Sequence, residues 1–147
     1  MGVATSEGCK SLMDLIENLV LYTKYMQGDL ESKYSLEFED SSLKDFNFSK
    51  FDLNNGVFLG VWFDHCDFSN VYLSGSHFGD SKFKHCVFDK NTLKKANWSY
   101  VNIHNTHICE LDAFRVDFYN SDIRDSIFER SSFFKCTFVN SSGNAVI

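Results

Sequence analysis

The strongest constraint on how this chain can fold is an apolar residue at every fifth position over about a hundred residues. Counted from Phe38 to Phe138, twenty-one consecutive positions spaced five apart hold an apolar side chain, and they take in 12 of the 16 phenylalanines. An α-helix repeats every 3.6 residues and a β-strand every two, so neither keeps a period of five on one face. The backbone must therefore turn within every repeat.

A second pattern accompanies the first, because the residue two places before each apolar centre is usually small. Examples are Val61, Cys66, Ser76 and Ser81. The other three positions of each repeat are mostly polar residues that suit turns and solvent. Large and small side chains are therefore predicted to alternate in one interior.

Two irregular repeats test this interpretation. Ala113 is a small centre, but the preceding small position holds Leu111, so the volume of the interior is kept. Asn91 places a polar side chain at an inward position. We expect its amide to bond to backbone at a local irregularity.

The repeat Cys66-Asp67-Phe68-Ser69-Asn70 closely resembles the consensus of the pentapeptide-repeat family, in which a small residue and Asp or Asn precede Leu or Phe. The resemblance covers about residues 36 to 140. It implies that four repeats form one square coil of 20 residues and that coils stack through backbone hydrogen bonds. The predicted fold is an all-β solenoid, a right-handed quadrilateral β-helix of about five coils.

Residues 1–35 are predicted to form an N-terminal segment with a capping α-helix over about residues 12–27. Ser11 and Asp14 resemble a capping box, an apolar stripe from Leu12 to Met26 follows, and Gly28 would end the helix. The open end of a solenoid must be covered. Residues at the small positions of the first coil are large and would fill that end, namely Leu36, Phe46 and Phe51.

The C-terminal tail, residues 141–147, is too short for a comparable helix. Either Ala145, Val146 and Ile147 fold over the last coil, or two chains meet there. Phe114 and Phe134 lie 20 apart at an outward position, near Phe138 at the end of the series. We expect these three aromatics to form a homodimer interface through the C-terminal coils, which the resemblance also implies. The alternative is that Phe114 and Phe134 are isolated surface aromatics.

Composition argues against several functional classes. The net charge is −6, with 20 acidic and 14 basic residues, so direct binding of nucleic acid is not predicted. No membrane span or secretory leader is recognisable. Five cysteines without a C-x-x-C pair predict neither a disulfide framework nor a zinc site. A reducing cytoplasmic location is expected.

Candidate metal and catalytic residues are also present. The cysteines of His65-Cys66 and His85-Cys86 would point inward and the histidines outward, while His104 and His107 lack a third ligand and are expected to be solvated. The carboxylate pairs Asp64 with Asp67 and Asp122 with Asp125 sit on a convex surface without a pocket. Cys109 points outward with no fixed basic partner. We therefore predict no metal, no cofactor and no enzyme activity.

The resemblance implies a binding function, since some family members mimic duplex DNA and protect type II topoisomerases. One face of the predicted solenoid is acidic and holds no Lys or Arg; its acidic residues are Glu37, Glu39, Asp40, Asp80 and Asp117. Residues 37–140 hold 15 acidic and 11 basic residues, a net of −4, whereas B-DNA of similar length carries about 14 negative charges. Mimicry would thus be confined to that face.

The predicted function is therefore non-enzymatic binding of a protein partner. The partner would be a DNA-binding protein, either a type II topoisomerase or a DNA-binding defence complex, which this chain would inhibit or protect. The lack of an inserted loop in the register and a basic band of lysines at residues 82–95 argue against a simple equivalence with drug-resistance members. The alternative is a scaffold or effector module that uses an outward apolar patch, Val57, Leu59 and Trp62, unless the N-terminal segment covers it.

Overall fold

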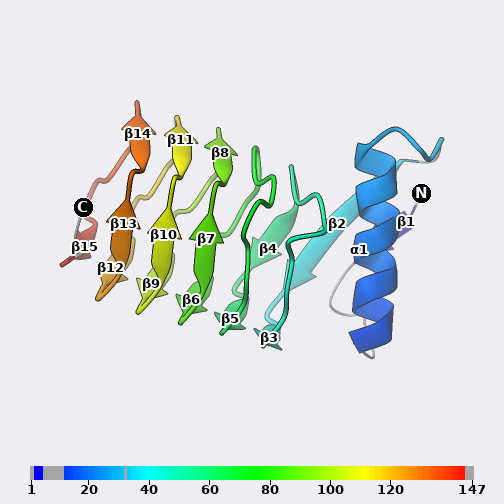
Figure 1. The fold of residues 1–147 in the computed structure, drawn as a ribbon, viewed down its shortest axis with the longest axis horizontal. Coiled ribbons are helices and arrows are strands. Elements are labelled where there is room, and N and C mark those ends of the chain that lie inside the picture. The colour runs from blue at the N-terminus through cyan, green and yellow to red at the C-terminus, as the bar shows by residue number, and fades with distance from the viewer. Residues whose placement is uncertain (1, 5–11, 32, 145–147) are drawn as a thin grey trace.

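The computed structural model describes residues 2–4, 12–31 and 33–144 and shows a stack of coils with one helix at its N-terminal end (Figure 1). The helix is α1 (Leu12–Met26). The strands are β1 (Gly2–Ala4), β2 (Tyr34–Glu39), β3 (Ser42–Lys44), β4 (Val57–Leu59), β5 (Trp62–Asp64), β6 (Lys82–Lys84), β7 (Val87–Asp89), β8 (Thr92–Lys94), β9 (Asn102–His104), β10 (His107–Cys109), β11 (Asp112–Phe114), β12 (Asp122–Arg124), β13 (Ile127–Glu129), β14 (Ser132–Phe134) and β15 (Ser142–Gly143). The predicted all-β solenoid of about five coils is confirmed.

Every strand pair from β2 onward is parallel and joins residues that are 20 apart. Phe38 lies beside Phe58 in β2 and β4, and Phe63 beside Phe83 in β5 and β6. The longest sheet runs β15-β12-β9-β6-β5-β3, and shorter sheets and isolated bridges form the other faces. Four repeats therefore complete one coil, as the period of five predicts.

The interior is a column of stacked aromatic rings. The rings of Phe48 and Phe68 are 4.6 Å apart, and those of Phe68 and Phe88 are 4.8 Å apart, nearly parallel in both pairs. Coil spacing in a parallel sheet is about 4.8 Å, so one ring per coil on each face fills the interior without gaps. The same stacking explains why the large position so often holds Phe.

The small inward residues satisfy backbone groups inside the coil. The Ser81 hydroxyl donates to the Phe58 carbonyl at 2.8 Å and accepts from the Val61 amide at 3.1 Å. The expected backbone bonding of Asn91 is confirmed, because its Nδ2 donates to the carbonyls of Phe68 and Val71 at 2.7 and 2.9 Å. The expected local irregularity is not found, since Thr92 pairs with Asp112 in the regular register. Leu111 and Ala113 are both buried, so the volume exchange is confirmed as well.

The corners of the coil require an uncommon backbone conformation. Among the described residues, eighteen that are not glycine have a positive φ of 45–61°, and they recur at the fifth position of the repeat from Asp40 to Asn140. This left-handed region suits Asn and Asp better than most residues. The turn in each repeat, which the period demands, is made there.

Helix α1 covers the first coil as predicted. Leu15, Leu19 and Tyr22 are buried in the common core, and the Tyr22 hydroxyl donates to the Asn54 carbonyl. Asp52 donates its amide to the Thr23 hydroxyl at 3.0 Å. The helix ends before Gly28, whose φ is +83°. Ser11 of the predicted capping box lies outside the described residues.

Two elements were not predicted from the sequence. Strand β1 pairs in parallel with β2 and so adds a rung beyond the first coil. At the other end, β15 pairs with β12, so the ladder continues past residue 140 into the segment that was expected to be a tail. Ala145 to Ile147, proposed to fold over the last coil, lie outside the described residues. Among the described residues, no helix is long and apolar enough to cross a membrane.

Candidate functional site

The five predicted acidic residues lie on one side of the solenoid. Glu37 and Glu39 come from β2, and Asp40 and Asp80 occupy corners with φ of 45° and 59°. Asp117, in the fifth coil, is stacked in line with Glu37. Parallel β-bridges connect the two through one residue of each coil between them, namely Val57, His77 and Asn97. The outward positions of this face hold no Lys or Arg between residues 37 and 140. We call this surface the acidic face.

The carboxylates of the acidic face lie at three levels, in the first, third and fifth coils. With about 4.8 Å per coil, neighbouring levels are about 9.6 Å apart and the outer two about 19 Å apart. Glu39, Asp40, Asp80 and Asp117 are exposed, and Glu37 is partly buried. The Asp117 carboxylate accepts a hydrogen bond from the Tyr119 amide at 3.0 Å, which holds its side chain beside the corner.

A glycine positions one of these carboxylates. Gly60 occupies the same corner as Asp40, one coil further along the stack. The Asp40 amide donates to the Leu59 carbonyl, and the Gly60 amide donates in the same way to the Gly79 carbonyl of the next coil. A Cβ atom at Gly60 would lie 2.6 Å from Asp40 Oδ1, so only glycine leaves this space to the carboxylate. Sequence reasoning missed this role, although a glycine 20 residues after an acidic corner was the available signal.

The lysines of the basic band point to the other faces. Lys82 and Lys84 lie on β6, and Lys94 lies on β8. The third-coil lysines thus lie on other faces, as the register predicted, but Lys82 reaches the edge of the acidic face, where it lines one hollow with Asp40.

The apolar patch of Val57, Leu59 and Trp62 spans β4 and β5. The side chains of Trp62 and Leu59 are 49% and 39% exposed, so the described part of the N-terminal segment does not cover them. A shallow hollow of about 330 Å³ beside Trp62 is lined by Asp40, Ser41, Ser42, Gly60 and Lys82. The patch thus borders both an acidic and a basic side chain.

The predicted aromatic stack at the C-terminal end is present. The rings of Phe114 and Phe134 are 5.7 Å apart and nearly parallel, and Phe134 is 56% exposed. Phe138 is 45% exposed and lines a hollow of about 440 Å³ at the end of the column together with Ile123, Phe128 and Phe133. The three residues of the predicted dimer interface therefore share one end of the molecule.

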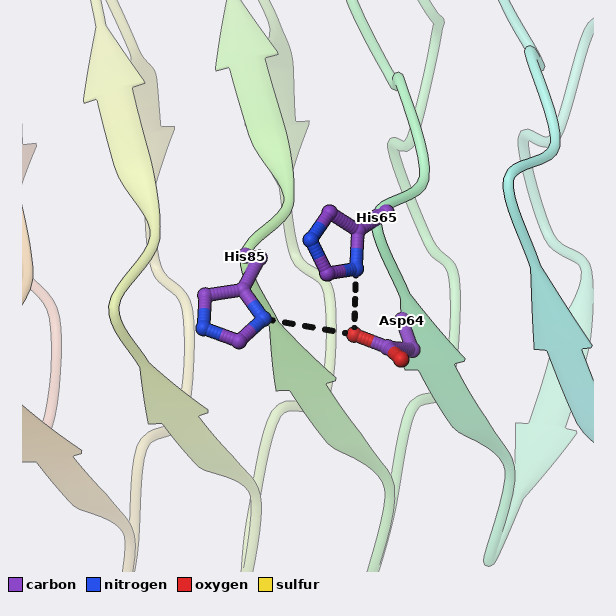
Figure 2. A group of neighbouring side chains, drawn as sticks. All are labelled: Asp64, His65 and His85. Atoms are coloured by element: carbon purple, nitrogen blue, oxygen red, sulfur yellow. Dashed lines mark hydrogen bonds and ion pairs between the residues drawn. The ribbon is translucent and has the colours of Figure 1, made fainter.

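The histidines and cysteines divide between outside and inside as predicted. Cys66 and Cys86 are buried, whereas the rings of His65 and His85 are exposed. Both rings turn toward the Asp64 carboxylate, however, which the sequence reasoning had grouped with Asp67 (Figure 2). The Asp67 carboxylate instead accepts a hydrogen bond from the Ser69 amide at 2.8 Å, a turn role.

Contacts with carboxylates modify the prediction that His104 and His107 are merely solvated. His104 lies 3.3 Å from the Asp122 carboxylate, which Arg124 also contacts at 2.6 Å. His107 lies 3.4 Å from Glu129. Desolvation would raise the pKa of Asp122, but hydrogen bonds from Arg124 and His104 outweigh it and hold that pKa below its ordinary value.

Asp125, the proposed partner of Asp122, is engaged elsewhere. Its carboxylate accepts from Asn144 Nδ2 at 3.1 Å, and its amide donates to Asn144 Oδ1 at 2.8 Å. This exchange ties the corner to the segment after β15. The two carboxylates are thus held by different partners.

The prediction for Cys109 was wrong in two respects. Its side chain is 7% exposed rather than open to solvent, and Arg130 Nη2 lies 2.9 Å from its Sγ. The guanidinium comes from the next coil and closes over the sulfur. Desolvation raises the pKa of the Cys109 thiol more than Arg130 lowers it, so the pKa stays above its ordinary value and the thiolate is disfavoured.

Comparison with protein families fits this geometry. Residues 66–97 match the family model of pentapeptide repeats, in 8 copies. The same register continues in the structure from β2 to β15. Residues 66–97 are therefore a run of pentapeptide repeats. A comparison of its sequence with curated proteins finds no match.

Solved structures of pentapeptide-repeat proteins are similar to this chain at low identity. One from the Arabidopsis thaliana thylakoid lumen is 17% identical, with 66% of this chain and 61% of that chain covered and a TM-score of 0.46. One from the cyanobacterium Cyanothece 51142 is 12% identical, with 90% and 98% covered and a TM-score of 0.42. QnrB1, a plasmid-mediated fluoroquinolone resistance protein, is 14% identical, with 70% and 53% covered and a TM-score of 0.39. The chain thus spans less than two thirds of the first and third of these proteins.

Proposed function

We propose that this protein is a non-enzymatic binding protein whose acidic face docks on the DNA-binding surface of another protein in place of duplex DNA. The observation that carries the proposal is the separation of charge: five acidic side chains lie on one face that holds no Lys or Arg between residues 37 and 140. The partner is therefore a protein with a basic surface, and the chain itself does not bind nucleic acid.

The number of charges fits one DNA strand rather than the duplex. The outer levels of the acidic face are about 19 Å apart, and one strand of B-DNA carries five or six phosphates over roughly that length. Three of the five acidic residues belong to the first coil, so the charge is concentrated toward the helix end. Hydrogen bonds between coils fix the backbone at the three levels of acidic residues. The acidic face therefore loses less conformational entropy when it binds a partner.

The proposed targets are a type II topoisomerase or a DNA-binding defence complex, in keeping with the family resemblance. We place this activity in the reducing cytoplasm, which the free thiols of Cys66 and Cys86 support.

The proposal includes a homodimer through the C-terminal coils. The stack of Phe114 and Phe134 and the exposed ring of Phe138 support it, because a second copy would bury them. Tail-to-tail pairing would double the coils to about 48 Å. Sedimentation of the parent and of Phe134→Lys tests it: a dimer that dissociates in the variant supports the interface, and a parent that sediments as a monomer refutes it.

Competition with DNA for a purified type II topoisomerase tests the acidic face. In the triple variant Glu37→Lys, Asp80→Lys, Asp117→Lys, competition should weaken about tenfold or more, because the face becomes basic. The matched control reverses three exposed acidic residues on other faces, Asp112→Lys, Asp125→Lys and Glu129→Lys, for the same net charge. Equal losses in both variants, or none in the first, would contradict the proposal.

The scaffold alternative is supported by the exposed apolar patch. Aromatic side chains in apolar surroundings often dominate protein interfaces. If the patch is the interface, Trp62→Ala should abolish partner binding while the charge reversals leave it unchanged. Tyr72→Ala is the control, since Tyr72 is 61% exposed on another face.

A further inference from the structure

The side chains of Asp64, His65 and His85 bring three potential metal ligands together on the surface of the second and third coils (Figure 2). His65 Nδ1 lies 2.8 Å from Asp64 Oδ1, and His85 Nδ1 lies 3.4 Å from the same oxygen. The three ligand atoms all lie within 4.8 Å of one another. This cluster lies outside the acidic face, and Asp64 is on strand β5 together with Trp62 of the apolar patch.

The backbone explains why the two rings converge. His65 and His85 occupy equivalent corners of consecutive coils, and both have a φ of 53°. The His65 amide donates to the Lys84 carbonyl at 3.0 Å, which fixes the two corners one coil apart. The rings therefore leave the backbone in the same direction, with centroids 4.5 Å apart. Asp64, the last residue of β5, immediately precedes the first corner.

We propose that Asp64, His65 and His85 form a binding site for a divalent transition-metal ion, with Zn²⁺ as the reference ion. Two imidazole nitrogens and one carboxylate oxygen suit Zn²⁺, Ni²⁺ and Cu²⁺, whereas Mg²⁺ and Ca²⁺ prefer oxygen ligands. Metal–ligand distances of 2.0–2.2 Å in a tetrahedral site place donor atoms about 3.4 Å apart. The distance from His85 Nδ1 to Asp64 Oδ1 already has this value. Small rotations of the exposed His65 side chain would lengthen the 2.8 Å distance from His65 Nδ1 to the same oxygen.

The residues around the cluster predict a modest affinity. Asp64 lies between Lys44 and Lys84 in the strand ladder, so two basic residues flank the carboxylate. Their charge opposes a cation, and the site provides only three protein ligands. Binding should therefore be in the micromolar range, and Lys44→Gln should tighten it. Because the ligands belong to two coils, the bound ion should also raise Tm.

Calorimetric titration of the metal-free chain with ZnCl₂ tests the site. One ion per chain is expected, and His65→Asn and His85→Asn should each weaken binding about tenfold or more. Asn suits both corners, because Asn105 occupies the equivalent corner one coil later with a φ of 49°. His77→Asn is the matched control, since Asn97 lies directly beside His77 in the next coil. It should bind Zn²⁺ as the parent does.

Titration with Co²⁺ distinguishes this site from the cysteines. A nitrogen and oxygen site should give no thiolate-to-cobalt charge-transfer absorption, and the cobalt spectrum should disappear in His85→Asn. Far-UV circular dichroism of each variant checks that the fold is retained. The proposal is overturned if the parent fails to bind Zn²⁺, if thiolate absorption appears, or if His77→Asn loses as much affinity as His85→Asn.

Discussion

Replacement of Phe83 by alanine would test the central claim that the repeated phenylalanines hold the coils together. The Phe83 ring is 1% exposed and lies between two nearly parallel rings, Phe63 at 5.0 Å and Trp98 at 5.1 Å. Truncating a buried Phe to Ala costs about 3–5 kcal/mol, which includes lost burial and the cavity that remains. Because the free energy of unfolding of a native domain is about 5–15 kcal/mol, Phe83→Ala should remove a large part of it.

Urea unfolding followed by far-UV circular dichroism measures this loss, and tryptophan fluorescence in a Trp62→Phe background reports on Trp98 at the site itself. Tyr72→Ala is the control, because its ring is 61% exposed and lies in no proposed interface. It should cost less than about 1 kcal/mol. A Phe83→Ala variant within 1 kcal/mol of the parent, or a control that costs as much, would refute the assignment of inward and outward positions.

Two further predictions concern the cap and the corners. Burial raises the pKa of Tyr22 to about 12, with a smaller contribution from Asp52, so the folded state keeps a proton that the unfolded chain loses near pH 10. Because the Tyr22 hydroxyl donates a hydrogen bond to the Asn54 carbonyl, the parent should be more stable than Tyr22→Phe at neutral pH. Urea unfolding should show this advantage shrinking as pH rises from about 10 to 12; a constant difference would contradict it. Lys95→Asn should raise stability by about 0.5–1 kcal/mol, because Lys95 has a φ of 57° and Asn tolerates that conformation better. Lys94→Asn, on the adjoining strand β8, should give no such gain in a thermal melt, and equal effects would argue against corner strain.

The fold could be predicted because one repeated physical demand runs through the sequence. A ring at every fifth residue requires a turn in each repeat, and the structure makes that turn at corners such as Asp40 and Asn140. The compensation between Leu111 and Ala113 followed from volume alone. Helix α1 followed from its apolar stripe and from Gly28. Strand β1 is only three residues long, too short to show a pattern of its own.

The details of the surface were harder to predict for a different reason. The period assigns each residue to a face and a coil, but it does not say which way an exposed side chain leans. The contact of Arg130 with Cys109 crosses from one coil to the next, and so does that of His85 with Asp64. Both pairs could have been found by comparing residues 20 and 21 apart for complementary chemistry.

The twenty-residue spacing of ladder partners makes the coil a modular unit of length. Removing residues 76–95 would join Gly75 to Ala96. It would bring Trp98 beside Phe58, because the rings of both now contact the ring of Phe78, which would be removed. All remaining side chains would keep their inward or outward sense, and the rod would shorten by a single rung of about 4.8 Å. Loss of one residue would instead misdirect every later ring. A protein of this design can therefore become longer or shorter by the duplication or deletion of whole coils, and its remaining core stays in register.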